Sequence, residues 1–408
     1  MTTPPLDPER RHVGTLDGVR AVAAYGVIAT HTGFQSGRSL DSGTFAPFLA
    51  RLEFGVTLFF LLSGFLLYRP FLLASLQGRP HPHWGSFWWR RLLRIAPAYW
   101  LVIVVVLGAM TAQMVTGAEW RDYLLLIQIY HHGRADSSLS QMWTLAVEIS
   151  FYAALPLLAW LATRLSFGRP LRAHLALVGG VAAVALTSNL VIHAHHLSSP
   201  ALQWLPTYAD WFALGMLLAI LSAAPVTAPP WMASLRAVAA APGTCWIAGA
   251  LLYWLSTLPM AGPRNLLPST AWEWTTRHYL YGLAAFCFLL PVMLGSSDWV
   301  RQLLGNRVMR FLGTISYGVY LWHLPLLIGI ARWMDWGVFQ GHFVPLYLLT
   351  TLSATAAATL SWYLLERPLL RRFSRPWRTA AASRGEDGPG DREQGEHLQH
   401  GAAREHVG

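Results

Sequence analysis

An arginine and a histidine flank a short apolar segment near the start of the chain: Arg20 precedes AVAAYGVIAT, and His31 follows it. If this stretch is helical, the two side chains lie nearly three whole turns apart on one face, separated by about 16 Å along the axis. A guanidinium binds phosphates through several N–H donors, and an imidazole can take a proton from a hydroxyl near neutral pH. The spacing therefore predicts an anion-binding group and a base on one helix. Taken singly, Arg20 also fits a helix-end anchor and His31 a polar rim residue.

A second basic pair follows in FWWRRLLRIAPAYW, where Arg90 and Arg94 are four residues apart. This spacing predicts that they share a helical face while Arg91 points elsewhere. Two guanidiniums on one face can hold phosphates through paired hydrogen bonds. The alternative is an anchor for lipid headgroups, since Trp88 and Trp89 flank the pair.

One carboxylate, that of Glu148, lies inside the apolar segment MWTLAVEISFY. A carboxylate in such surroundings is expected to be paired or protonated, because an isolated charge is costly there. A carboxylate can also hold the tautomer of a basic histidine and stabilise its cation. We therefore predict that Glu148 supports His31, the alternative being a structural partner for an arginine.

Four further residues are candidates for supporting roles. Asp17 precedes the apolar run and is predicted to be the N-cap of its helix. Ser63 is followed by Gly64, which indicates close helix packing or a kink; a nucleophilic serine is disfavoured because no Gly-x-Ser-x-Gly turn surrounds it. Tyr320 and His323 are three residues apart and favour a polar core, with a catalytic role for His323 left open.

The elements that must position these groups are membrane helices. Of the 408 residues, 54% are hydrophobic and 12% are charged, against about 25% charged in soluble domains. All 30 basic residues are arginines, and most flank apolar stretches. The formal charge of +10 therefore indicates membrane topology and contact with anionic lipid, not nucleic acid. The two cysteines have no ligand spacing, and the clustered histidines have no carboxylate or cysteine companion nearby, so no metal is expected.

Apolar periodicity predicts an all-α, polytopic membrane protein with about ten transmembrane helices. The predicted spans are 16–33, 52–73, 95–117, 143–164, 173–196, 205–224, 243–258, 278–295, 308–333 and 343–366. With both termini cytoplasmic, 23 of the 30 arginines fall on the cytoplasmic side, as the positive-inside bias requires. We expect a multi-pass protein of the cell membrane. It divides into a cytoplasmic segment 1–15, a membrane domain 16–373 and a disordered cytoplasmic tail 374–408.

Six blocks in order resemble the acyltransferase-3 family of integral membrane acyltransferases, over about residues 15–372. They are TLDGVRAVAAYGVIATH, FGVTLFFLLSGFLLYRP, WWRRLLRIAPAYW, WTLAVEISFY, SYGVYLWHLPLL and LLERPLLRR. The family's arginine-x10-histidine landmark corresponds to Arg20 and His31, and its arginine-xxx-arginine pair to Arg90 and Arg94.

The block around Glu148 usually carries two adjacent acids in this family. Here the second place is Ile149, so the resemblance supports only a scheme with a single acid at this point.

The resemblance implies transfer of an acyl group, often acetyl, from cytoplasmic acyl-CoA to a hydroxyl. The acceptor would be extracytoplasmic or membrane-associated, usually a carbohydrate or a glycosylated metabolite. Acyl-CoA would be a co-substrate, with no further cofactor. Its phosphates would meet Arg20, Arg90 and Arg94, and its thioester would reach His31 through the protein interior.

Two other classes of function are alternatives to acyl transfer. An exporter of a small metabolite or glycolipid intermediate would call for broken helices and inverted repeats, which the sequence does not display. A non-catalytic scaffold would leave the ionisable groups Arg20 and Glu148 without a purpose in an apolar setting.

Overall fold

The computed structural model describes residues 8–110, 115–131, 137–194, 200–225, 228–264, 269–295 and 297–373. The predicted tail 374–408 lies outside these residues. Within the described part all regular structure is helical, with no strand, which confirms the all-α class.

In the described residues, nine long helices build the bundle. They are α1 (Pro8–Gln35), α3 (Gly55–Leu76), α4 (Trp84–Met110), α6 (Trp143–Arg164), α7 (Pro170–Ala194), α8 (Leu205–Ala223), α11 (Ala271–Leu294), α13 (Arg307–Trp333) and α14 (Phe343–Ser361). A π-helical turn, Trp362–Glu366, joins α14 to α15 (Arg367–Phe373). The shorter helices are α2 (Ala46–Ala50), α5 (Gly117–Leu124), α9 (Pro230–Ala239), α10 (Pro242–Leu255) and α12 (Asp298–Leu304).

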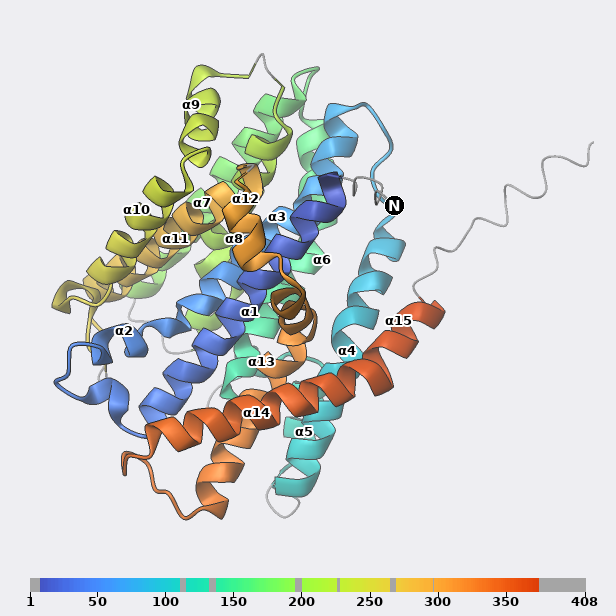
Figure 1. Ribbon diagram of the computed structural model, residues 1–408. Helices are drawn as coiled ribbons and strands as arrows, with labels where there is room; N and C mark the ends of the chain where they lie inside the picture. Colours follow the sequence, from blue (N-terminus) through green and yellow to red (C-terminus); the bar gives the residue numbers. More distant parts are fainter. Residues whose placement is uncertain are drawn as a thin grey trace, which may run out of the picture. The chain divides into compact units, whose positions relative to one another are not determined.

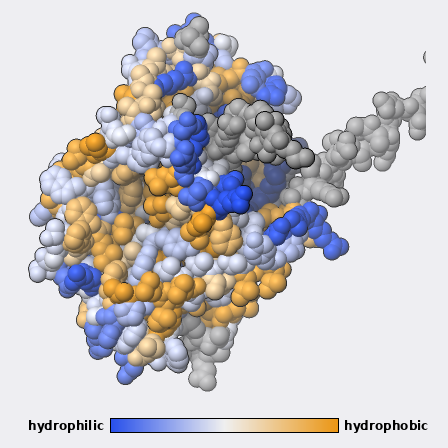
Figure 2. Space-filling view, in the orientation of Figure 1, coloured by the Kyte–Doolittle hydropathy of each residue, from blue (hydrophilic) through white to orange (hydrophobic). Residues whose placement is uncertain are grey.

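Eight helical segments in the described residues are long and apolar enough to cross a membrane, and a ninth if α9 and α10, bent by 92°, form one span. The chain is therefore a multi-pass membrane protein. Helix α1 contains the predicted span 16–33 but is not among the eight, because Asp17, Arg20 and His31 lower its hydropathy. The total of ten and the orientation of the termini stay predictions. Figure 2 shows hydrophobic residues over much of one face, with hydrophilic ones in patches.

Helices α3 and α8 cross with their backbones in contact, through Gly64 and Gly215. A Cβ atom on Gly64 would stand 2.3 Å from the carbonyl oxygen of Phe212, and one on Gly215 would stand 2.1 Å from that of Leu61. No side chain fits at either position. The packing predicted from Gly64 is thus present, with Gly215 as its counterpart.

Helix α1 runs through the middle of the bundle, where it packs against α3, α13 and α14 (Figure 1). Its first half approaches its neighbours through glycines: a Cβ on Gly18 would stand 2.0 Å from the carbonyl oxygen of Leu304, and one on Gly313 would stand 2.0 Å from that of Asp17. These approaches fix the turn that carries Asp17 and Arg20 against α13.

Candidate active site

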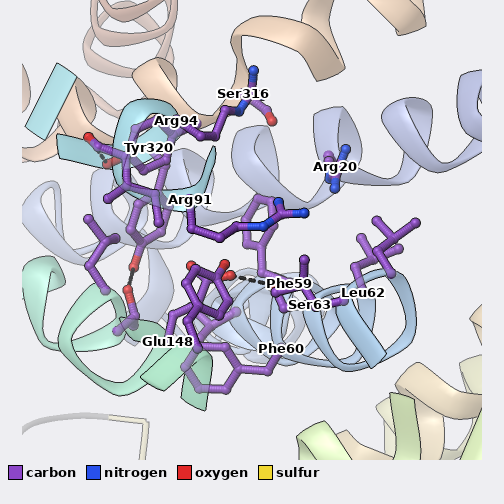
Figure 3. A pocket seen from close by; sticks show the side chains of 18 residues that line it. Arg20, Phe59, Phe60, Leu62, Ser63, Arg91, Arg94, Glu148, Ser316 and Tyr320 are labelled. Atoms are coloured by element: carbon purple, nitrogen blue, oxygen red, sulfur yellow. Dashed lines mark hydrogen bonds between the residues drawn. The ribbon is translucent and has the colours of Figure 1, made fainter. Parts of the chain in front are cut away.

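A cavity of about 330 Å³ lies between α1, α3, α4, α6 and α13, and we call it the Arg20 cavity. Side chains far apart in the sequence meet there (Figure 3). Its polar lining consists of Arg20, Ser63, Arg91, Arg94, Thr144, Glu148, Tyr152, Ser316, Tyr317 and Tyr320. Three guanidiniums and one carboxylate therefore line one small cavity.

Arg20 is oriented by Asp17, one helical turn before it. Its Nη1 atom donates to Asp17 Oδ1 at 3.0 Å. The prediction that Asp17 is an N-cap was wrong, because α1 already begins at Pro8 and Asp17 lies inside the helix. The carboxylate instead holds the guanidinium at the cavity.

The second arginine of the cavity is Arg91, and this corrects the predicted geometry of Arg90 and Arg94. Arg90 is exposed and does not line the cavity, whereas Arg91 and Arg94 both do. Arg91 lies four residues after Phe87 and four before Ile95, both buried, so it belongs to the inward row of α4. Its Nε atom is buried and has no hydrogen-bond partner among the described residues.

The third arginine, Arg94, is held by the end of the chain's last long helix. Its guanidinium carbon lies 5.2 Å from the centre of the Trp362 ring, a cation–π contact. The carboxylate of Glu366, only 2% exposed, acts electrostatically on Arg94 and accepts a hydrogen bond from Ser361 Oγ at 3.2 Å. Sequence reasoning missed Glu366, although an acid at the end of an apolar span gave the same signal as Glu148.

Glu148 and Ser63 are hydrogen-bonded neighbours in the lining of the Arg20 cavity. The Ser63 hydroxyl donates to Glu148 Oε1 (Figure 3), and Tyr152 also hydrogen-bonds to this carboxylate. Arg91 acts on it electrostatically. The predicted pairing of Glu148 with His31 is not present, because His31 lines a different cavity.

That second cavity, of about 590 Å³, lies beside the C-terminal end of α1, and we call it the His31 cavity. Glu53 lines it beside His31, and the Tyr281 hydroxyl donates to Glu53 Oε1 at 3.2 Å. The charge of Glu53 acts on the His31 ring. Sequence reasoning missed Glu53, which is the second residue of the predicted span 52–73, at the polar boundary where carboxylates are common. The other polar lining residues are Thr30, Gln35, Ser39, Arg51, Ser140, Arg264, Ser269 and Arg277.

One wall of the His31 cavity is fixed by Arg51, which is 3% exposed. Its Nε atom donates to the carbonyl oxygen of Ser256 at 3.0 Å, and its Nη2 atom donates to those of Ala261 and Gly262 at 3.3 and 2.6 Å. Three donors of one guanidinium thus tie the start of α3 to the segment after α10.

Among the described residues the two cavities have no lining residue in common, so Arg20 and His31 line separate cavities and not the single one expected between them. Residues of α13 separate them. Tyr320 lines the Arg20 cavity and hydrogen-bonds to Thr144 Oγ1 at 2.8 Å. His323 lines neither cavity, and its ring centre lies 5.4 Å from that of Tyr320 and 5.2 Å from that of His31. We call this row of rings, Tyr320, His323 and His31, the partition.

The fold and the site thus define a multi-pass helical membrane protein with guanidiniums in one interior cavity and an imidazole in a second. The family described as an acyltransferase domain matches residues 13–367, and the chain belongs to this acyltransferase-3 family.

Among curated proteins, the peptidoglycan O-acetyltransferase OatA of Listeria monocytogenes is 26% identical over 78% of this chain and 50% of its own length. The O-acetyltransferase OatA of Staphylococcus aureus is 22% identical over 89% of this chain and 58% of its own length. The chain thus spans about half the length of these relatives. No solved structure matches it.

Proposed function

We propose that the chain is an O-acyltransferase of the cell membrane. It moves an acyl group, most simply acetyl, from cytoplasmic acyl-CoA to a hydroxyl of an extracytoplasmic or membrane-associated carbohydrate. The observation that carries this proposal is that Arg20, in the middle of α1, and His31, near its C-terminal end, line two polar cavities, and that the His323 ring contacts a lining residue of each.

The donor binds at the Arg20 cavity. Arg20, Arg91 and Arg94 offer N–H donors for phosphate oxygens, and guanidiniums pair with phosphates through two parallel hydrogen bonds. The Nε atom of Arg91, buried without a partner among the described residues, is available to such a ligand. Glu148, bonded to Ser63, keeps the cavity from being uniformly cationic. With the predicted orientation this cavity opens towards the cytoplasm, where acyl-CoA is found.

The acceptor binds at the His31 cavity, whose many hydroxyl, amide and guanidinium groups suit the hydroxyls of a sugar. His31 takes the proton of the attacking hydroxyl as general base. Glu53 stabilises the imidazolium that results, the role first assigned to Glu148. The thioester reaches the partition from one side and the hydroxyl from the other, so the rings between them must shift for the atoms to meet.

The names of the relatives support acetyl as the acyl group and a cell-wall glycan as the acceptor class. Because the chain spans about half of their length, both assignments rest on the shared membrane part.

The test is acyl transfer by purified protein in lipid vesicles, with labelled acetyl-CoA and soluble peptidoglycan fragments. Wild type is expected to label the carbohydrate. His31→Gln is expected to stay folded and bind acetyl-CoA, yet to lose about 100-fold or more in rate. The control is His342→Gln, an exposed histidine outside both cavities, which keeps full activity. Normal transfer by His31→Gln would overturn the proposal, and solute uptake by vesicles without acyl-CoA would favour an exporter.

A further inference from the structure

In the described residues, His323 is the one aromatic ring that contacts both His31, in one cavity, and Tyr320, in the other. It is fully buried, on α13. Its ring contacts His31, which lines the His31 cavity, and Tyr320, which lines the Arg20 cavity. An imidazole at this position can carry a proton from one cavity towards the other within the protein interior.

The tautomer of His323 follows from its backbone contact. Its Nδ1 atom lies 2.6 Å from the carbonyl oxygen of Tyr320. A carbonyl oxygen only accepts, so Nδ1 carries the hydrogen and donates it. In a neutral imidazole the other nitrogen, Nε2, then holds a lone pair.

The Nε2 atom of His323 makes no hydrogen bond to the described residues. It is also buried. Buried polar atoms are nearly always paired, and an exception calls for an explanation such as a role in catalysis.

The surrounding helix is built to keep this ring in place. Pro325 has no N–H, which leaves the carbonyl oxygen of Leu321 without its usual helical donor. Gln141 supplies that donor from its Nε2 atom at 3.2 Å. The Tyr320 hydroxyl in turn donates to the carbonyl oxygen of Gln141 at 3.2 Å. These bonds fix the turn of α13 that carries His323.

We propose that His323 relays the proton from His31 to the sulfur of the departing thiol. This step rests on the proposed function, in which a thioester donor and a hydroxyl acceptor meet at the partition. The acceptor O–H bond breaks, and its proton goes to His31 while its oxygen forms the new C–O bond. The C–S bond breaks, and the sulfur leaves with its electron pair. His323 Nε2 takes the proton from the His31 imidazolium and gives it to that sulfur, so both rings end neutral and the products are an ester and a thiol.

The test uses the full-length protein in single-turnover transfer from acyl-CoA, in mixtures of H₂O and D₂O. The variant is His323→Gln, because a glutamine amide can still donate to the Tyr320 carbonyl but cannot take up a proton. We expect its rate to fall about 100-fold, with the KM of both substrates within threefold of wild type. We also expect the dependence of rate on D₂O fraction to be bowed in wild type, where more than one proton moves in the slow step, and linear in the variant.

A matched control is His174→Gln. His174 is also fully buried with an unpartnered Nε2 among the described residues, but it is bonded to Tyr68 and lines neither cavity. It should leave the rate and the isotope dependence unchanged.

Three outcomes would overturn the relay: an unchanged rate in His323→Gln, a linear dependence in wild type, or a slow variant that keeps the bowed dependence, which would make His323 structural. Normal transfer by His31→Gln overturns the proposed function instead, so the two failures are distinguishable.

Discussion

Glu53 and His31 line the same cavity, although one stands just before α3 and the other near the end of α1. Glu53 is the carboxylate whose charge acts on the His31 ring. If His31 becomes positively charged during transfer, removing this charge raises the barrier. Glu53→Gln is therefore expected to lower kcat by about 10- to 100-fold with an unchanged melting temperature. Glu119→Gln, a conservative change in the capping box of α5, is the control. A variant as fast as wild type would remove Glu53 from the mechanism.

Adjacent arginines on α4 give a matched pair. Arg91 lines the Arg20 cavity and Arg90 is exposed, so Arg91→Gln is expected to raise the KM for acyl-CoA by about 10-fold or more, the worth of a charge-assisted hydrogen bond. Arg90→Gln should leave it within twofold of wild type. Isothermal titration with CoA provides the same comparison without turnover. Equal effects of the two changes would mean that the cavity is not where the phosphates bind.

The crossing of α3 and α8 predicts a stability effect without any substrate. A methyl group at Gly215 must displace the backbone of α3, so Gly215→Ala is expected to cost about 1–3 kcal/mol. Gly179→Ala, in a part of α7 with open space around the new methyl, should be neutral or stabilising, because alanine favours helix. Melting temperatures in one detergent measure both. Indistinguishable melting curves would contradict the close crossing.

His81, between α3 and α4, gives a prediction about pH. Burial lowers the pKa of His81 below its ordinary value of 6.5, and its Nε2 atom lies 2.9 Å from the Thr163 hydroxyl. The unfolded chain then binds a proton at a higher pH than the folded chain does, so folding stability falls as pH drops through about 6.5. The drop in melting temperature between pH 7.5 and about 5.5 should be smaller in His81→Gln than in wild type. His83→Gln, at an exposed position two residues away, should follow wild type. A drop in His81→Gln as large as that of wild type would exclude this histidine as its source.

The helical architecture could be predicted from apolar periodicity, because every long helix has an apolar run at its centre. Arg20, Arg94, Ser63, Glu148 and Tyr320, which the sequence also pointed to, line one cavity in the structure. Each is a polar group in an apolar segment, and such groups turn inward to avoid lipid.

What the sequence could not provide is the relation between helices. The spacing predicted Arg90 and not Arg91 on the face of Arg94, although neighbours three and four residues apart both lie near one face. The burial of Phe87 and Ile95 places Arg91 on the inward side. Likewise, nothing in the segment around Glu148 says which of the two cavities it faces. The N-cap assignment of Asp17 failed for a local reason, since the polar residues from Pro8 onward also adopt helix.

The bonds from Arg51 to three main-chain carbonyls bear on how this scaffold could diversify. A lysine, with one compact charge, could not reach all three acceptors in the same fixed fork. The main chain bonded to Arg51 is therefore expected to tolerate neither insertions nor replacement of this arginine. Lining side chains such as Gln35, on α1, can vary without breaking these hydrogen bonds. If the acceptor binds in the His31 cavity, evolution of acceptor preference is therefore expected to replace lining side chains such as Gln35, while Arg51 and the main chain bonded to it stay unchanged.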